Sequence, residues 1–452
     1  MKKSTDIRIK EVKSETERHL YRSPMKFGGR VVTDVVLLHV TATVETRDGR
    51  VGTGRGSMPM GNIWGWSSSD LVTPEQTLAA MIRMGEYVAE QANQCQFVGH
   101  PLEIMHEYAK NYDAFAETCV KSLSIAESTP KLAQLVAASP LDAAIFDAYG
   151  KTLGANVYNL LSSDYCNVDL AFYLNNEFRG EFLDKYTLRT PKKQMPLYHL
   201  VGALDPLTEH DLTKRLNDGL PETLPEWIRA DGLTHLKIKL NGNDLDWDVN
   251  RICAVDAIAE ETDESRDWNF SADFNEKCES VEYLLEFLKK IGEQSPQAIK
   301  RLRYLEQPTN RNLKLYPENK MHKAAAIKPV VIDESLVDFE SLLLSREQGY
   351  SGVAIKACKG QSEALLMGAA AQKYGMYLCV QDLTCPGASF LHSATLSARI
   401  PTVAAIEGNA RQYCPSANAD WDKEYPGMFH VQNGMLQTEI LAEHGLGFHW
   451  RI

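Results

Sequence analysis

The sequence predicts an α/β protein whose largest part is a parallel barrel of eight β/α units. From about residue 165 onward, short apolar segments typical of strands alternate with segments of helical periodicity. Several of these strands end in a charged residue, and a parallel barrel gathers its active-site side chains at that edge. The 452 residues suffice for one such barrel with about 200 further residues.

The segment before the barrel predicts an α+β region. VVLLHVTATVETRDGRVGTGRG is typical of two strands joined by a turn at Asp48. A helix should follow Thr73, because a proline comes next and Gln76 can complete a capping box. Another helix is expected to start near Pro140 and to end before Gly154. The glycines of GTGRGS lie in the hairpin with no helix after them, so they do not predict a nucleotide loop.

The barrel strands follow from the apolar segments after residue 165. They are expected at Val168–Leu174, His235–Leu240, Asn269–Phe274, Arg303–Glu306, Val330–Asp333, Val353–Ile355, Met376–Val380 and Thr402–Ile406. The step from the first to the second strand is about twice as long as the next ones, which predicts an insertion at about residues 176–225. Such a segment either decorates the surface or shapes a substrate site. The last 40 or so residues no longer alternate between strand and helix patterns and are expected to pack on the N-terminal part.

Composition and charge exclude several classes of protein. The formal net charge of −12 argues against general binding of nucleic acid. The nine cysteines form no CxxC pair, which argues against a zinc site or a disulfide framework. The N-terminus is densely charged, and no apolar run approaches the length of a membrane span. We therefore expect a cytoplasmic protein with no membrane partner.

Two lysines share one face of the second predicted strand. Lys237 and Lys239 lie two residues apart, so both side chains point to one side while Ile238 points to the other. If Ile238 faces the helices, both ammonium groups face the barrel mouth, where each would lower the pKa of the other. A solvated edge strand with two exposed lysines would give the same pattern, and KxK alone does not distinguish the two.

Three carboxylates end the next three strands. Asp273, Glu306 and Asp333 follow FSA, RYL and VVI, about one β/α unit apart. Each alone is also typical of a helix N-cap. Together they would converge at one spot, where three anions repel one another unless a cation joins them, and hard oxygen ligands suit Mg²⁺. The pattern therefore predicts a site for one Mg²⁺ ion.

A further lysine, Lys356, ends GVAIK on the sixth strand, four strands beyond Lys239. It should therefore face Lys239 across the barrel. A metal between two opposed lysines could bind a substrate carboxylate and stabilise the enediolate that forms when the α-proton leaves, with one lysine on each face.

The chain resembles the enolase superfamily, specifically its mandelate racemase/muconate lactonizing enzyme group. The resemblance rests on PLDAAIFDAYGKTLGANVYNLL, HLKIKL, FSADFNE, YLEQP, VIDES, AIKACKG and the final HGLGF. It implies a modified, TIM-like (β/α)8 barrel at residues 161–410. An α+β capping domain at residues 1–160 is completed by residues 411–452. The seventh strand reads MYLCVQDL with no histidine, and His392 lies in the following helix as a packing residue. The pattern therefore resembles the subgroup of muconate lactonizing enzymes and dipeptide epimerases.

The resemblance also implies roles for individual residues. Asp273, Glu306 and Asp333 resemble the Mg²⁺ ligands, and Lys239 and Lys356 resemble the acid/base pair. Lys237 resembles a partner that contacts the substrate carboxylate and tunes Lys239. Further candidate substrate contacts are Asn275, Glu407, Arg22 and Lys26, each of which could instead be a turn residue, a structural ion pair or a surface charge.

Substrate choice is expected to come from three segments, Arg22–Thr33, Ser57–Ser68 and Glu407–Gln412. In the second, Trp64 and Trp66 could exclude solvent or simply pack. The chain lacks a DxD after the eighth strand, which puts a dipeptide substrate in doubt.

The predicted activity is abstraction of a proton α to a carboxylate by a racemase, epimerase or cycloisomerase. An acid-sugar dehydratase of the same superfamily, a lyase, shares the first half-reaction. A Schiff-base aldolase would leave the three carboxylates unexplained. A barrel that binds metal and ligand without catalysis is the alternative from another class. By analogy with the family, we expect a homo-oligomer.

Overall fold

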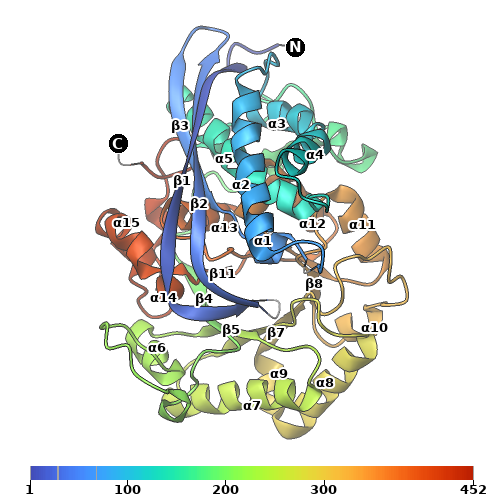
Figure 1. Cartoon of the computed structure of the whole chain (residues 1–452), viewed down its shortest axis with the longest axis vertical. Helices are drawn as coiled ribbons and strands as arrows, with labels where there is room; N and C mark the ends of the chain where they lie inside the picture. The colour runs from blue at the N-terminus through green and yellow to red at the C-terminus, as the bar shows by residue number, and fades with distance from the viewer. Residues whose placement is uncertain (1, 28–29, 68, 451–452) are drawn as a thin grey trace.

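The computed structural model describes residues 2–27, 30–67 and 69–450, and it contains a closed parallel barrel below an N-terminal α+β layer (Figure 1). The barrel strands pair in sequence order, and the last pairs with the first, which closes the barrel. They are β4 (Met195–Val201), β5 (His235–Lys239), β6 (Asn269–Asp273), β7 (Leu302–Glu306), β8 (Val330–Ile332), β9 (Gly352–Ile355), β10 (Tyr377–Val380) and β11 (Ile406–Glu407). The predicted fold class is confirmed.

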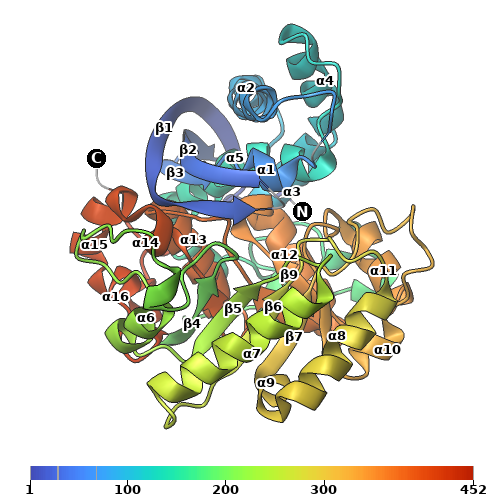
Figure 2. The same cartoon turned by 60° about the horizontal axis from the view of Figure 1, so that its bottom comes forward.

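Helices between the strands cover the outside of the barrel (Figure 2). They are α6 (Leu224–Asp231), α7 (Leu245–Thr262), α8 (Val281–Gln294), α9 (Pro296–Arg301), α10 (His322–Ala325), α11 (Phe339–Glu347), α12 (Gln361–Lys373) and α13 (Ala388–Arg399). The strands are apolar on the side that meets these helices. Ile238, for example, is fully buried between the two barrel lysines of β5.

The first barrel strand is not where the sequence predicted it. Val168–Leu174 forms a 3-10 turn at Leu170–Phe172, which begins where the Asp169 side chain accepts a hydrogen bond from the Ala171 backbone. Phe172 and Tyr173 then pack against the ring of His106 in the N-terminal layer. The strand that opens the barrel is β4, inside the predicted insertion.

The N-terminal layer is a three-stranded antiparallel sheet packed on helices. Its elements are β1 (Ile7–Phe27), β2 (Arg30–Thr46), β3 (Val51–Pro59), α1 (Asn62–Gly65), α2 (Pro74–Ala92), α3 (Pro101–Ala109), α4 (Tyr112–Ser122) and α5 (Lys131–Leu153). The β2–β3 hairpin and the capping box of Thr73 and Gln76 are confirmed. The predicted start near Pro140 is wrong, because α5 begins at Lys131 and contains that proline; its end at a left-handed Gly154 is confirmed.

The glycines of GTGRGS pack the sheet against α5. A Cβ on Gly54 would overlap the backbone of Ala144 and Ala148, and one on Gly56 would overlap Pro140. The segment is strand β3 throughout, so its glycines serve close packing and not a nucleotide.

The C-terminal segment returns to both parts of the molecule. It comprises α14 (Ala410–Tyr413), α15 (Ala419–Glu424), α16 (Pro426–Phe429) and β12 (Met435–Leu436). Strand β12 adds to β4, and Gly445 pairs with Asn156 behind α5. Near the chain end, the Trp450 ring lies under Arg55 of β3.

Long β1 curves away from the helices of its own layer, and its far end lies at the barrel (Figure 2). There, Tyr21 stacks on Tyr413 of α14, with ring centroids 6.1 Å apart. None of the helices in the described ranges is long and apolar enough to cross a membrane.

Candidate active site

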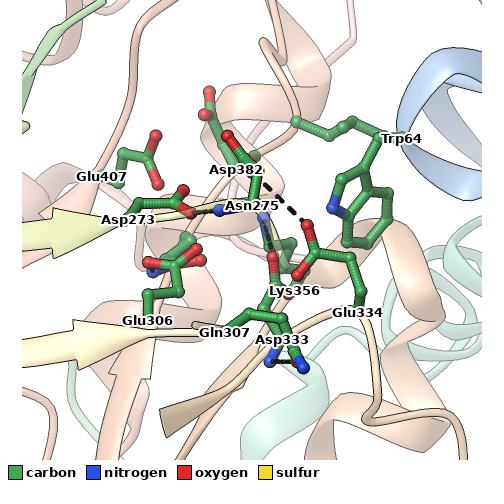
Figure 3. A network of polar contacts seen from close by, with 12 residues as sticks. Trp64, Asp273, Asn275, Glu306, Gln307, Asp333, Glu334, Lys356, Asp382 and Glu407 are labelled. Atoms are coloured by element: carbon green, nitrogen blue, oxygen red, sulfur yellow. Dashed lines mark hydrogen bonds and ion pairs between the residues drawn. The ribbon is translucent and has the colours of Figure 1, made fainter. Parts of the chain in front are cut away.

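The carboxyl ends of the barrel strands form one buried cluster of lysines and carboxylates (Figure 3). Lys239, Asp273 and Glu306 lie level with one another, since Lys239 pairs with Asp273 across β5 and β6, and Asp273 pairs with Glu306 across β6 and β7. Asp333 and Lys356 follow directly on β8 and β9. These residues are 1–6% exposed, so KxK does not belong to a solvated edge strand.

Lys237 lies at the centre of the carboxylates. Its Nζ donates to Glu306 Oε1 and Glu407 Oε2, both at 2.8 Å, and lies 3.2 Å from Asp273 Oδ2. Burial alone would lower the pKa of Lys237, but these three carboxylates raise it well above its ordinary value. The net shift of the Lys237 pKa is therefore opposite in direction to the lowering expected from a neighbouring lysine.

The other lysine of KxK binds two groups of β6 and its following turn. Lys239 Nζ donates to Asp273 Oδ2 and, at 3.2 Å, to Asn275 Oδ1. The Asn275 backbone N–H also donates to Asp273 Oδ1 at 2.8 Å. Asn275 has a positive φ of 44° and is 8% exposed, so it is both a turn residue and a direct partner of the predicted base.

Lys356 faces the cluster from the opposite side of the barrel. Its Nζ lies 3.0 Å from Asp333 Oδ2 and donates to the backbone oxygen of Asp382 at 3.3 Å. The ring of Trp64, from α1, covers it at 4.6 Å. Burial would lower the pKa of Lys356, but Asp333 outweighs it and raises the pKa.

Repulsion among the carboxylates shows in their pKa values. Burial, followed by the charges of Asp273 and Asp333, raises the pKa of Glu306 well above its ordinary value. Burial also opposes ionisation of Asp273, yet the adjacent lysines hold its pKa below the usual range. For Glu334, burial and the adjacent Asp333 raise the pKa to about 7.

Several site residues were not singled out from the sequence. Lys359 donates to the Asp333 backbone oxygen at 2.5 Å and lies under Trp64, and Gln381 donates to Glu306. Gln307 accepts from the Asp333 backbone N–H at 2.9 Å and so holds that turn. Asp382 follows the predicted seventh strand, and its place at a strand end is the sequence signal that indicates a site residue.

A cavity of about 260 Å³ opens above the cluster. Lys237, Lys239 and Lys356 line its floor, and residues of β1, β2 and α1 line its upper wall. The cavity includes parts of all three predicted substrate segments; residues 28, 29 and 68 of these segments lie outside the described residues. Glu407 lines it while it pairs with Lys237, so both of its predicted roles are compatible with its position.

Arg22, Lys26 and Trp66 do not line this cavity. Arg22 pairs with Asp218 in the loop after β4, where Nη2 lies 2.9 Å from Oδ1, and it lines a separate cavity of about 410 Å³. Lys26 lines neither cavity. Trp66 is buried and donates to Glu127, which is a packing role. His392 is also a packing residue, bound to Gln361 at 2.8 Å.

Metal binding can be judged from the donor set. The cluster has six carboxylates and four lysines, which leaves a formal charge of −2 when all are ionised. The carboxylates are Asp273, Glu306, Asp333, Glu334, Asp382 and Glu407. The lysines are Lys237, Lys239, Lys356 and Lys359. One divalent cation would balance that charge. As arranged here, no three His, Cys, Asp or Glu side chains in the described part of the chain form a ready ligand set, since ammonium groups lie between the carboxylates.

Fold and site together define a capped α/β-barrel protein with a buried carboxylate–lysine centre at its strand ends. A family model described as "Enolase C-terminal domain-like" matches residues 220–451, more than half of the chain, and the chain belongs to that family. Comparison with curated proteins finds no matching sequence.

Solved structures of similar fold span nearly the whole chain. A dipeptide epimerase from Enterococcus faecalis V583, complexed with Mg and the dipeptide L-Leu-L-Tyr, is 17% identical, with 97% of this chain and 99% of that chain covered and a TM-score of 0.61. A muconate lactonizing enzyme from Pseudomonas fluorescens, complexed with muconolactone, is 17% identical with coverage of 97% and 96% and a TM-score of 0.59. An enolase from Pseudomonas fluorescens Pf0-1 with bound magnesium, potassium and tartrate is 15% identical, with coverage of 98% and 90% and a TM-score of 0.62.

Proposed function

We propose that the protein is an enolase-superfamily enzyme that abstracts the proton α to a substrate carboxylate with the help of Mg²⁺. The observation that supports this most directly is the pair Lys239 and Lys356. They come from β5 and β9, four strands apart in the closed barrel, and line the same cavity. A carbon between two such amines can lose a proton to one and regain it from the other. We therefore favour a racemase, an epimerase or a cycloisomerase.

Asp273, Glu306 and Asp333 are the residues that would hold the metal ion. They are buried carboxylates on three adjacent strands, and their oxygens are the donors that Mg²⁺ prefers. When bound, Mg²⁺ supplies positive charge that stabilises the negative charge developing on the substrate carboxylate.

The protein's own groups position and shield the reaction. Asn275 orients Lys239, and Asp333 with the Asp382 carbonyl orients Lys356. Trp64 covers Lys356 with an apolar ring and excludes water from that side. Glu306, Glu407 and Asp273 keep Lys237 charged, so it can attract the carboxylate end of a substrate.

The test is exchange of the substrate α-proton in D₂O, followed by ¹H NMR over a panel of chiral carboxylates with Mg²⁺. We expect exchange that EDTA abolishes and Mg²⁺ restores. Lys239→Ala and Lys356→Ala should each reduce it by about 100-fold or more, each for one enantiomer. Exposed Lys320→Ala is the matched control and should exchange at the wild-type rate. Exchange that continues unchanged in both site variants would exclude the mechanism.

The same spectra distinguish the outcomes that share this first step. Epimerisation returns the substrate skeleton with inverted configuration, cycloisomerisation gives a ring, and the acid-sugar dehydratase predicted as an alternative would release water and give a keto acid. Binding of Mg²⁺ without any exchange would favour the non-catalytic barrel.

A further inference from the structure

The upper wall of the cavity, which the N-terminal layer forms, is mostly apolar. Val32 lies opposite Met25 in the register of β1 and β2, so their side chains share one face of the sheet, and both line the cavity. Helices α1 and α2 and the segment after β3 add to the same wall. Its apolar side chains include Met25, Val32, Val36, Met60, Ile63 and Leu78. The floor, in contrast, carries the three lysines.

Polar side chains of this wall already have partners within the protein. The amide nitrogen of Asn62 donates to the Pro74 backbone oxygen at 2.8 Å and to Thr77 Oγ1 at 2.9 Å, so both of its N–H groups are used. The Tyr21 hydroxyl forms a hydrogen bond with Thr384. A ligand hydroxyl against these residues would have to compete with bonds that the protein makes for itself.

One buried donor of the wall has no partner in the described part of the protein. It is Trp64 Nε1 (Figure 3). The centroid of the Trp64 ring lies 4.6 Å from Lys356 Nζ, so this donor is close to the floor. It can serve one acceptor of a ligand there, such as a carboxylate oxygen. A polyhydroxylated chain, in contrast, needs a partner for each hydroxyl that it buries.

The charges of the upper wall disfavour a second anionic group on the ligand. Among the described residues of this wall that line the cavity, the cation is Arg18, and it already pairs with Asp34 at 2.9 Å. Exposed Glu75 also lines the cavity, so the wall carries two acidic residues and one basic residue. The basic residues Arg22 and Lys26 do not line it.

We propose that the substrates are monocarboxylates with an apolar substituent, and that the upper wall selects them against acid sugars and dicarboxylates. This rests on the proposed function, in which the carboxylate lies at the floor of the cavity. The substituent then extends along the apolar side chains of the upper wall. Both the substituent and the wall lose apolar surface to water when the ligand is absent, and burial of that surface favours binding.

The experiment measures the affinities of four carboxylates for the Mg²⁺-loaded protein by calorimetry. Butanoate and hexanoate differ by two methylene groups. Adipate and gluconate have the six-carbon chain of hexanoate with a second carboxylate or with five hydroxyls. Val32→Lys places a cation on the wall, and Val32→Ile keeps the wall apolar. Exposed Val51→Lys, on β3 and outside the cavity, is the matched control. Thermal melting identifies any variant that fails to fold.

We expect wild type and Val51→Lys to bind hexanoate about ten-fold more tightly than butanoate, since each buried methylene contributes about three- to four-fold. Adipate and gluconate should bind at least about ten-fold more weakly than hexanoate, because their charge or hydroxyls would lie against the apolar wall. Val32→Ile should keep this order. Val32→Lys should bind adipate about ten-fold more tightly than wild type does, through a charge-assisted hydrogen bond.

The proposal is overturned if wild type binds butanoate as tightly as hexanoate, binds adipate or gluconate as tightly as hexanoate, or binds none of the four ligands. An adipate affinity that Val32→Lys leaves unchanged would also overturn it. If Val32→Lys does not fold, the four affinities of wild type decide.

Exchange in D₂O separates this inference from the proposed function. If adipate or gluconate exchanges its α-protons while hexanoate does not, the function stands and the apolar selection is excluded. If hexanoate binds with the expected preference but no carboxylate exchanges, the apolar selection stands and the proton-abstraction function is excluded.

Discussion

Replacement of Lys237 by methionine should destabilise the folded protein strongly. The ammonium group is 1% exposed and contacts three carboxylates at 2.8, 2.8 and 3.2 Å. Methionine fills a similar volume but leaves those carboxylates without their shared cation. Removal of one partner from a buried ion pair costs about 3–5 kcal/mol. With an unfolding entropy of about 1 kcal/mol per kelvin for a chain of this length, the melting temperature should fall by about 3–5 °C.

The assay is thermal unfolding near pH 8 and near pH 5, with and without Mg²⁺. The pKa of Glu306 is already raised, and loss of Lys237 raises it further. Stability that the variant has lost at high pH should therefore return in part as the pH falls and the carboxylates take up protons. Mg²⁺ should also restore part of it. The control is exposed Lys320→Met. The reasoning is refuted if Lys237→Met melts like the control, or if its loss is the same at both pH values.

Three further outcomes are expected. Burial raises the pKa of Glu363 from 4.5 to about 8. The contribution of Glu363 to stability is therefore full below about pH 4.5 and is lost as the pH rises through 8, with an upper limit of about 5 kcal/mol. Glu363→Gln should flatten the decline of the melting temperature over that pH range. Gly54→Ala should lower the melting temperature or prevent folding, at a cost of about 1–3 kcal/mol, because its Cβ overlaps the Ala148 backbone. Arg22→Ala should lower the free energy of unfolding by less than about 1 kcal/mol. It should nevertheless speed hydrogen–deuterium exchange in the loop around Asp218, which mass spectrometry measures. Unchanged exchange there would show that this ion pair does not hold the loop.

The central part of the site could be predicted because barrel strands are short and regular. A charged residue after three or four apolar residues can only lie at the strand end, and neighbouring parallel strands put such residues level with one another. Asp273 and Glu306 are paired in this way, and β5 presents both its lysines to the interior because side chains alternate along a strand. No knowledge of the loops was needed for either inference.

The first barrel strand could not be found by the same rule. Met195–Val201 contains a proline and a histidine, which weaken the strand pattern. Pro196 is tolerated because it is the second residue of β4 and comes before the pairs that β4 makes with β11 and β5. Val168–Leu174 has the better pattern but packs its aromatic residues on the N-terminal layer. The start of α5 is hidden for a related reason. Pro140 suggests a helix start, yet it lies inside a helix that is buried along most of its length.

Tertiary contacts determine which partners the long charged side chains meet. Arg22 and Lys26 lie in a predicted substrate segment, but neither position says which partner the side chain meets. Asp218, almost 200 residues further on, binds Arg22.

The pKa of Lys237 shows an effect of the fold that the spacing of the two lysines does not predict. Two lysines two residues apart predict mutual lowering of their pKa values, and that inference was sound for an isolated strand. In the folded barrel Lys237 meets three carboxylates contributed by three other strands, and their attraction exceeds the effect of burial on its pKa. Lys237 is therefore the counter-ion of the carboxylate cluster. Its removal should therefore lower the stability of the centre, and thermal unfolding measures that effect directly.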